Sequence, residues 1–498
     1  MRNLILAIDQ GTTSTRCIAF DSTGAVTHSA SLEFPQIYPN SGWVEHDPEA
    51  IFQSVVSCID RLNLNANEDA IKAVGITNQR ETIVAWDRET CRPFHNAIVW
   101  LDTRTKSMVD KIGHSGGIHQ NQKITGLPVS TYFSALKIKW LIDNVPEIPI
   151  ALASKTCCFG TIDSYLTYRL TGNKKVFVTD CANASRYNLM DIHTLDWSVP
   201  ICFELGIPIH SLPKIVSNSE IVGHISSSIP KLENVPIASL IGDQHAALLG
   251  HGCVHRGGCK ITYGTGSFLL MNTDKPVFSP SGALLTTMAF KLGPTTASMY
   301  ALEGSVASAG RSVQWAKDNL RIGENLIEFN ELAASVPDTC GVTFVPAFSG
   351  LFAPYWRDDA RAVIVGMSLR SNYRHIARSI LEATAVQCAQ VLELLEVESG
   401  IEMDSVVTDG GMTKSDLLMQ MQSDLLNKEI KRSKMPESTA FGAAYAAGLC
   451  VGFWDTSITV PLYDSFMPNM SETERRNTFT RWDDAVKRSF GLTQFSDN

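Results

Sequence analysis

Two segments of the chain, residues 4–24 and 260–276, follow the same local plan, and this repeat limits the fold more than any other feature of the sequence. Each consists of an apolar strand, a short turn rich in Gly and Thr, a second apolar strand and a polar turn. The short turns are residues 9–13 and 264–266. A hairpin that recurs in this way predicts a duplicated architecture with two similar domains.

The segments that follow each hairpin alternate between strand and helix patterns. Asp47, Pro48 and Glu49 form a typical helix start, and an apolar helical face continues from it to residue 62. Further strands are predicted at 73–77, 82–86, 98–101 and 405–408, and further helices at 374–398 and 415–426. Strands that precede helices in each half predict a mixed sheet flanked by helices in both domains.

The chain of 498 residues is too long for one hydrophobic core. The glycine-rich stretch 250–258 is the best boundary, so we predict an N-terminal domain at 1–250 and a C-terminal domain at 251–498. No low-complexity linker separates the two halves. The domains are therefore expected to share an interface that contains a cleft.

Composition and charge exclude several classes of function. The net charge is −9 and no block of basic residues is present, so we expect no nucleic-acid partner. No apolar run approaches the ~18 residues of a membrane-spanning helix, and the first residues do not resemble a signal peptide. The twelve Cys residues include no C-x-x-C pair, which favours reduced thiols. We therefore expect a cytoplasmic protein without a membrane span.

The first hairpin turn contains the residue types of a phosphate-binding site. Small residues let backbone N–H groups approach an anion, and the hydroxyls of Thr12, Thr13 and Ser14 with the cation of Arg16 can complete its shell. Asp9, at the end of the strand, can orient water bound to Mg²⁺. The same residue types are also common in ordinary polar turns. Neither a P-loop nor a G-x-G-x-x-G after a strand is present, so a nucleotide would be bound by another fold.

Several motifs occur together in an order that makes the resemblance to one family specific. They are residues 9–14, 242–244, 262–266 and 409–411, with two longer segments at 132–144 and 362–382. Together they resemble the FGGY kinases of the sugar kinase, heat-shock protein and actin superfamily, from residue 4 to about residue 455. The resemblance implies two duplicated actin-like (ribonuclease H-like) α/β domains, each with a mixed sheet flanked by helices, and an interdomain cleft.

The positions that bind substrate in this family resemble those of its members that phosphorylate glycerol. They are Arg80, Glu81, Trp100, Tyr132, Asp243, Gln244 and Phe268. Three hydroxyls on three carbons need a few aimed donors and acceptors and apolar walls against the carbons. Arg80 and Glu81 can supply the donor and the acceptor, while Trp100 and Phe268 can supply walls. Taken singly, Tyr132 and Phe268 are more simply interpreted as core residues.

The resemblance also implies the reaction, which is in-line phosphoryl transfer from ATP to glycerol with Mg²⁺ on the phosphates and Asp243 as the general base. Asp243 follows the apolar run 238–241, so it is expected to project from a strand end into the cleft. The simpler interpretation is a carboxylate that caps a helix beginning near Gln244. By resemblance, Thr12, Thr13, Ser14, Arg16 and Thr265 contact the phosphates, and Gly310, Gln314, Gly411 and Ser415 contact the nucleoside. Ser415 departs from the family pattern, because bacterial relatives commonly have Asn there.

Three other functions stay open at this stage: another FGGY polyol or sugar kinase, an ATP-dependent binding or chaperone module without kinase turnover, and a glycerol-binding regulator that has lost turnover. We also expect a homodimer or homotetramer. Some bacterial relatives bind fructose 1,6-bisphosphate through a glycine-rich loop with an Arg. The corresponding residues here, 226–236, contain neither Gly nor Arg, so we expect no inhibition by this bisphosphate.

Overall fold

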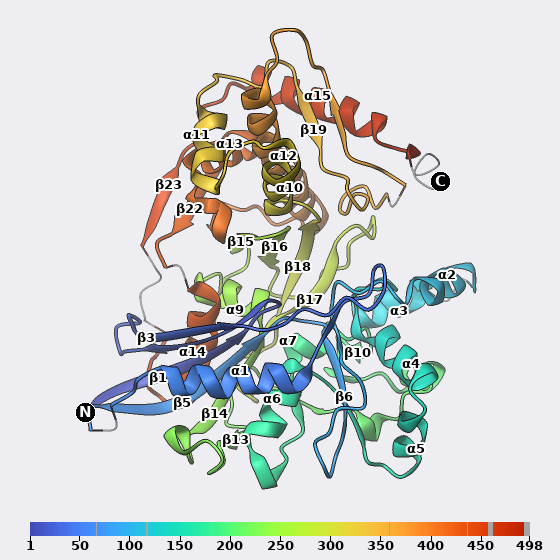
Figure 1. Cartoon of the computed structure of the whole chain (residues 1–498), viewed down its shortest axis with the longest axis vertical. Helices are drawn as coiled ribbons and strands as arrows, with labels where there is room; N and C mark the ends of the chain where they lie inside the picture. The colour runs from blue at the N-terminus through green and yellow to red at the C-terminus, as the bar shows by residue number, and fades with distance from the viewer. Residues whose placement is uncertain (66, 116–117, 358, 436, 457–461, 493–498) are drawn as a thin grey trace.

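The computed structural model describes residues 1–65, 67–115, 118–357, 359–435, 437–456 and 462–492. These residues form two lobes that lie one above the other along the long axis of the molecule (Figure 1). The N-terminal lobe is built on a six-stranded sheet in the order β13-β14-β5-β1-β2-β3, beside a four-stranded sheet in the order β4-β7-β6-β8. The C-terminal lobe is built on a seven-stranded sheet in the order β17-β18-β16-β15-β21-β22-β23.

The strands have the following bounds. The six-stranded sheet contains β1 (Arg2–Gln10), β2 (Ser14–Phe20), β3 (Val26–Glu33), β5 (Asp69–Asn78), β13 (Gly223–His224) and β14 (Pro236–Gly242). The seven-stranded sheet contains β15 (Cys259–Tyr263), β16 (Ser267–Asn272), β17 (Leu285–Phe290), β18 (Met299–Val306), β21 (Ser405–Asp409), β22 (Glu429–Ser433) and β23 (Tyr463–Phe466). The four-stranded sheet contains β4 (Glu45–His46), β6 (Ile83–Asp87), β7 (Ala97–Ile98) and β8 (Cys157–Thr161). Smaller pairs join β9 (Val178–Asp180) to β12 (Lys214–Val216), β10 (Met190–Asp191) to β11 (Asp196–Trp197), and β19 (Thr343–Val345) to β20 (Val363–Val365).

The helices flank these sheets. In the N-terminal half they are α1 (Pro48–Arg61), α2 (Lys106–Ser115), α3 (Ile118–Thr125), α4 (Ser134–Asn144), α5 (Glu147–Ala153), α6 (Ile162–Leu170), α7 (Cys181–Ala184), α8 (Val199–Glu204) and α9 (Asp243–Gly250). In the C-terminal half they are α10 (Gly310–Leu320), α11 (Leu326–Ala334), α12 (Tyr373–Ser399), α13 (Asp416–Leu426), α14 (Ser438–Cys450) and α15 (Glu472–Arg488). Short 3₁₀ turns lie at Gly172–Lys174, Ile209–Ser211, Pro230–Leu232 and Gly411–Lys414.

The two large sheets repeat one topology. Strand β1 pairs antiparallel with β2 and parallel with β5, and β15 pairs antiparallel with β16 and parallel with β21. On one side β3 and β18 continue the two sheets antiparallel, and on the other side β14 and β22 continue them parallel. The duplication predicted from the two hairpins is confirmed, and so is a mixed sheet flanked by helices in each lobe.

Local signals in the sequence account for most element boundaries. Asp47 caps α1 by accepting a hydrogen bond from the backbone N–H of Glu49 at 2.9 Å, as the helix start predicts. Helix α12 begins after Asn372 and ends at Gly400 in the left-handed conformation. The strand predicted at 98–101 is shorter than expected, since the backbone N–H of Asp102 bonds to the carbonyl of Val99 and closes a turn there.

Helix α9 contacts strands of both large sheets and packs on helix α14. A Cβ atom added at Gly442 would lie 1.9 Å from the carbonyl oxygen of Ala246, and one at Gly250 would lie 2.1 Å from that of Ser438. The two glycines therefore permit a backbone contact that larger residues would block. Helix α14 also packs on β1, β5 and β14, so a helix from the C-terminal half covers the N-terminal sheet (Figure 1). The domain boundary at residues 250 and 251 stays a prediction.

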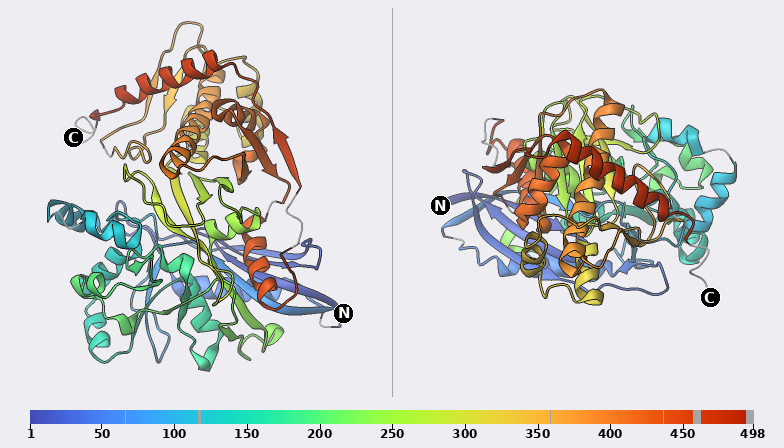
Figure 2. Two further views of the ribbon diagram at one scale, coloured as in Figure 1. Left: turned by 180° about the vertical axis from the view of Figure 1, so that it is seen from behind. Right: turned by 90° about the horizontal axis from the view of Figure 1, so that it is seen from above.

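Each lobe has an apolar core of its own. The N-terminal core surrounds α1 and β1, and the C-terminal core surrounds α12 and β15. Helix α15 crosses the C-terminal lobe when the molecule is seen from above (Figure 2). Over the part of the chain that the structure describes, no helix combines the length and the apolar character that a membrane span requires.

Candidate active site

The first hairpin brings together residues that the sequence assigns to phosphate and metal. Strands β1 and β2 place Asp9 opposite Arg16, and Nη2 of Arg16 lies 2.6 Å from Oδ2 of Asp9. Nη1 of Arg16 lies 2.7 Å from Oε2 of Glu437, just before helix α14. Burial raises the pKa of Asp9 above its ordinary value, although Arg16 opposes the shift. Two carboxylates therefore hold the predicted phosphate ligand Arg16, and an incoming phosphate would compete with them.

The turn of this hairpin is tight and partly accessible. The backbone N–H of Gly11 donates to the carbonyl of Ser14 at 2.9 Å, which closes the turn. Thr12 and Ser14 are half-buried and Thr13 is exposed. The predicted hydroxyl-bearing residues thus lie on a turn with free surface, as phosphate contact requires.

Three aromatic rings form a wall beside the same turn. The ring centroid of Trp100 lies 5.7 Å from that of Tyr132 and 5.9 Å from that of Phe268. The indole Nε1 of Trp100 donates to Oγ1 of Thr12 at 3.0 Å. Phe268 belongs to β16 of the C-terminal sheet, whereas the other residues belong to the N-terminal half. The structure therefore brings the predicted apolar walls and the phosphate hairpin together.

Arg80 and Glu81 follow the end of β5 and are almost fully buried, at 3% and 1% exposed. The backbone N–H of Gln79 bonds to the carbonyl of Gln10 at 2.8 Å, which ties this segment to the first hairpin. Glu81 has a φ angle of 61°, in the left-handed region that few residues other than Gly adopt. Such backbone strain is concentrated at functional sites.

Two residues that the sequence interpretation missed hold this pair in place. Nη1 and Nη2 of Arg80 donate to the carboxylate of Glu303 at 2.6 and 2.9 Å. Nε of Arg186 donates to Oε1 of Glu81 at 2.6 Å, and its Nη2 donates to Glu303 at 3.2 Å. Glu303 is a charged residue inside the apolar strand β18, and that placement is the only sign in the sequence of a buried functional charge there. No sequence pattern indicated Arg186.

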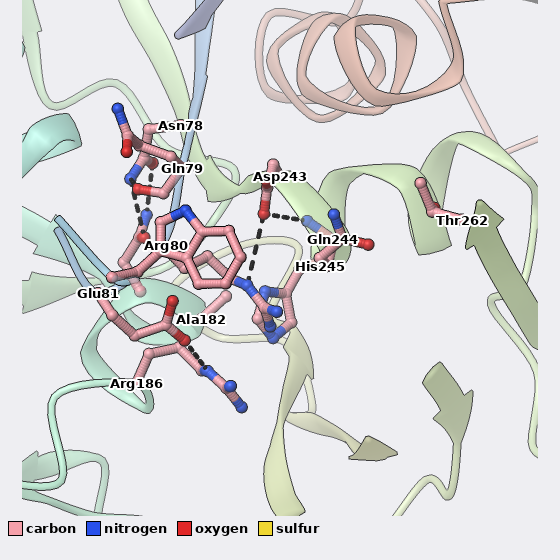
Figure 3. Close-up of polar contacts among 12 residues, drawn as sticks. Asn78, Gln79, Arg80, Glu81, Ala182, Arg186, Asp243, Gln244, His245 and Thr262 are labelled. Atoms are coloured by element: carbon pink, nitrogen blue, oxygen red, sulfur yellow. Dashed lines mark hydrogen bonds and ion pairs between the residues drawn. The ribbon is translucent and has the colours of Figure 1, made fainter. Parts of the chain in front are cut away.

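Asp243 is the first residue of helix α9, directly after strand β14. Its Oδ1 accepts the backbone N–H of Gln244 at 2.7 Å and lies 3.4 Å from Nε of Arg80, as Figure 3 shows. Its side chain keeps 29% exposure. Burial raises the pKa of Asp243, while Arg80 opposes the shift and Asp9 adds to it. The carboxylate thus combines access with a basicity above that of an ordinary Asp.

A buried lysine orients the other predicted polar ligand. Nζ of Lys260 donates to Oε1 of Gln244 and, at 2.8 Å, to Oγ1 of Thr262. Burial lowers the pKa of Lys260 to about 8. Because the amide oxygen of Gln244 is occupied, its NH₂ group is the end that can donate to a ligand.

A second predicted group of residues lines a cavity of about 640 Å³ in the C-terminal lobe. Of the residues assigned to nucleotide, Thr265, Gly310, Gln314 and Gly411 line it. A Cβ atom at Gly410, where φ is 95°, would lie 2.3 Å from the carbonyl of Tyr263, and a Cβ at Gly411 would enter open space. The volume falls within the range of ~300–1,000 Å³ that small-molecule and cofactor sites occupy.

Ser415 does not line this cavity. Its hydroxyl accepts the backbone N–H of Leu418 at 3.2 Å and caps helix α13.

Asp409 ends strand β21, just before the glycine turn. Its Oδ2 accepts a hydrogen bond from Ser438 at 2.5 Å and lies 2.9 Å from Nε2 of His251. Burial alone would raise the pKa of Asp409, but His251 and Ser438 lower it. Asp409 therefore connects the end of β21 to Ser438 at the start of α14 and to His251 just after α9, both through Oδ2.

Two family models together match most of the chain. Residues 4–250 match the N-terminal domain of the FGGY family of carbohydrate kinases, and residues 259–450 match its C-terminal domain. These matches include both hairpins, Asp243 and the glycine turn after β21.

Individual relatives resemble the chain over its whole length. A glycerol kinase from Chloroflexus aggregans is 46% identical over 500 residues, which cover 98% of this chain and 99% of that protein. A probable glycerol kinase from Dictyostelium discoideum is 43% identical over 98% of both chains. The crystal structure of Plasmodium falciparum glycerol kinase with ADP is 40% identical and aligns with a TM-score of 0.92 over 98% of both chains.

Proposed function

This chain belongs to the FGGY family of carbohydrate kinases, and from that premise we propose that it transfers the terminal phosphoryl group of ATP to glycerol. The products are sn-glycerol 3-phosphate and ADP, and the reaction is the first step of glycerol utilisation. The observation that carries the proposal is the convergence of Arg80, Glu81 and Asp243 with three aromatic walls beside the first hairpin. Support also comes from relatives named glycerol kinase that match 98% of the chain.

The geometry supports a general-base mechanism. Asp243 takes the proton of one glycerol hydroxyl as that oxygen forms a bond to the terminal phosphorus and the bond to the ADP oxygen breaks. Arg80 donates to glycerol oxygens and Glu81 accepts from its hydroxyls. The rings of Trp100, Tyr132 and Phe268 shield the carbons and exclude water, which would otherwise accept the phosphoryl group.

The cavity of the C-terminal lobe suits ATP. Backbone at Gly310 and Gly411 can approach the nucleoside closely, and Thr265 lies where the second hairpin can contact phosphates. The charge of Asp9 contributes to the raised pKa of Asp243, and carboxylate oxygens are ligands that Mg²⁺ prefers. Asp9 would hold Mg²⁺ through water, and the ion would neutralise charge on the phosphates.

A coupled assay tests the proposed substrate. We expect glycerol with Mg·ATP to give a far higher kcat/KM than xylulose, ribulose or gluconate, with sn-glycerol 3-phosphate as the product. The reason is that the three-carbon chain of glycerol fits between the aromatic rings while Arg80 and Glu81 bind adjacent hydroxyls. A pentulose with the higher kcat/KM would assign the chain to another FGGY sugar kinase. ATP binding without turnover of any polyol would favour a binding module or a regulator.

Three further properties are proposed from family membership. We expect the division into domains at 1–250 and 251–498, and the two family models leave only residues 251–258 unmatched between them, which supports it. We also expect a cytoplasmic location and a homodimer or homotetramer. Light scattering of the purified protein measures the assembly directly.

Fructose 1,6-bisphosphate is expected to leave the activity unchanged at millimolar-scale concentrations. A bisphosphate needs donors aimed at both ends, and Arg supplies a fork that Lys cannot reproduce. Within residues 226–236, Lys231 is the one basic residue, and its Nζ already donates to the carbonyl of Asp60 at 2.5 Å. Initial rates measured across a bisphosphate series check this. Saturable inhibition that disappears in Lys231→Ala would contradict the expectation.

A further inference from the structure

Four charged side chains form a closed, buried group beside the predicted glycerol pocket. We call Arg80, Glu81, Arg186 and Glu303 the charge cluster. Their side chains are between 0% and 2% exposed. Two cations and two anions are joined in a chain, because Glu303 accepts from both arginines and Arg186 also donates to Glu81. The cluster is therefore electrically balanced, as buried ionic groups must be.

Within the charge cluster, most of the hydrogen-bonding atoms are paired with one another, and Nε of Arg80 faces Asp243 instead. Both terminal nitrogens of Arg80 bond to Glu303, so its Nε is the atom directed at Asp243, 3.4 Å away. Arg186 occupies Oε1 of Glu81, which leaves Oε2 to accept from a ligand. Figure 3 shows the hydrogen bond between Arg186 and Glu81, and the side chain of Arg80 below Asp243.

The two partners come from parts of the fold that also build the pocket. In the β16–β18 ladder, Leu270 lies opposite Glu303, and Phe268 lies two residues before Leu270. Side chains two residues apart share a face of a strand, so Phe268 and Glu303 lie on one face of the C-terminal sheet. The guanidinium of Arg186 lies 5.6 Å from the ring centroid of Tyr132. The same two residues thus support both the polar and the apolar parts of the pocket.

We propose that Glu303 and Arg186 are positioning residues for polyol binding, which hold Arg80 and Glu81 in the orientation that recognises substrate hydroxyls. This inference rests on the proposed kinase function. An Arg side chain has many rotamers, and a bidentate carboxylate selects one of them before the ligand arrives. Glu303 belongs to the C-terminal sheet, whereas Arg80 and Glu81 belong to the N-terminal half. The orientation of these two substrate-binding residues therefore depends on the contact between the lobes.

The first test is Glu303→Gln, which keeps the side-chain shape and removes the charge. We expect the KM for glycerol to rise roughly 10- to 100-fold, as for loss of one charge-assisted hydrogen bond. The KM for ATP should change less than about threefold, since the cluster does not line the nucleotide cavity. Glu382→Gln is the matched control, because Glu382 also pairs with an arginine, Arg481, but between helices α12 and α15. That control should keep both KM values.

A charge-balanced double variant separates positioning from stability. Glu303→Gln alone leaves an excess buried cation, and Arg186→Gln alone leaves an excess anion, so both single variants should lower Tm. Arg186→Gln combined with Glu303→Gln restores neutrality and should recover part of the Tm. The KM for glycerol should nevertheless stay high, because Arg80 and Glu81 still lack the charged partners that fix their orientation. Calorimetric titration with glycerol provides the same comparison without turnover.

Different results would overturn different claims. A wild-type protein that does not phosphorylate glycerol would overturn the proposed function and this inference with it. An active wild type whose Glu303→Gln variant keeps its glycerol KM would overturn the positioning role alone. Recovery of glycerol KM in step with Tm in the double variant would also overturn it, because the cluster would then act only through stability. If Glu303→Gln does not fold, the double variant alone decides the question.

Discussion

Replacing Asp243 by Asn is expected to lower kcat by roughly 10²- to 10⁴-fold while the affinity for ATP is largely kept. Asn has nearly the same shape and its oxygen can still accept the backbone N–H of Gln244, so helix α9 should begin as before. What is lost is the group that takes the proton from glycerol. Substrate and nucleotide would still be bound and aligned, which explains why some turnover should remain.

Steady-state rates with glycerol and Mg·ATP, and titration with ADP, measure the two quantities. Asp47→Asn is the control, since Asp47 caps helix α1 and Asn is an equally good capping residue. This control should leave kcat unchanged. Near-normal turnover in Asp243→Asn would remove Asp243 from the catalytic role and favour its interpretation as a helix-start carboxylate.

The acid side of the pH profile gives a second measurement on Asp243. Burial raises the pKa of Asp243 above its ordinary value of 3.8, so protonation should abolish the base at a higher pH than for an exposed Asp. We expect kcat/KM of the wild type to fall on the acid side through this group. The same limb should be absent from the profile of Asp243→Asn, because Asn does not titrate.

The elements around the site are predictable from sequence because their signals are local. The turn at residues 9–13 contains small and polar residues between two apolar runs, and the strand pairing follows from that pattern. The start of α1 is encoded in three consecutive residues, from Asp47 to Glu49. Repetition of the hairpin then predicts the duplicated sheets without any knowledge of long-range contacts.

The charge cluster could not be predicted in this way, because its contacts join distant parts of the chain. Arg80 and Glu303 are 223 residues apart, and Arg186 and Glu303 are 117 residues apart. A Glu inside an apolar strand signals a buried charge but does not identify its partner. Helix α14 gives a second example, since it lies in the C-terminal half of the sequence but packs on the N-terminal sheet. Both features depend on how the lobes meet.

The presence of a serine at position 415 is explained more simply by helix capping than by the predicted contact with nucleotide. Its hydroxyl caps helix α13, which Ser does well at a helix start. The family resemblance assigned the position to nucleotide, yet Ser415 does not line the cavity that Gly310, Gln314 and Gly411 share. Its contact with nucleotide stays a prediction.

Arg80→Ala is the substitution from which we expect the largest combined loss of stability and substrate binding. It removes both terminal nitrogens from Glu303 and leaves that carboxylate buried with Arg186 as its remaining cation in the charge cluster. Breaking a buried ion pair by removing one partner costs about 3–5 kcal/mol of unfolding free energy. Loss of a charge-assisted hydrogen bond to glycerol should cost about 1.5–3 kcal/mol of binding. ATP affinity should change little.

Chemical denaturation and calorimetric titration with glycerol and ADP measure these effects separately. Arg104→Ala is the matched control, because Arg104 is also buried and donates to two carboxylates, Asp102 at 2.8 and 2.9 Å and Glu45 at 2.7 Å. It should lose stability to a similar extent and keep glycerol binding. If Arg80→Ala loses ADP rather than glycerol, Arg80 belongs to the nucleotide end of the site.

The pH dependence of stability decides whether the stability loss arises at Glu303. In the wild type, burial alone would raise the pKa of Glu303, but Arg186 and Arg80 lower it to about 2, against an ordinary value of 4.5. The stabilisation from this carboxylate is therefore complete above about pH 4.5 and is lost as the pH falls towards 2. Without Arg80, less positive charge offsets the desolvation of Glu303, so the pKa of Glu303 rises. The ionised carboxylate then destabilises the folded variant, and this effect is largest at neutral and alkaline pH. The gap in denaturation midpoint between wild type and Arg80→Ala should accordingly narrow as the pH is lowered from 8 to 5. A gap that stays constant over this range would place the cause of the lost stability elsewhere than in an unpaired Glu303.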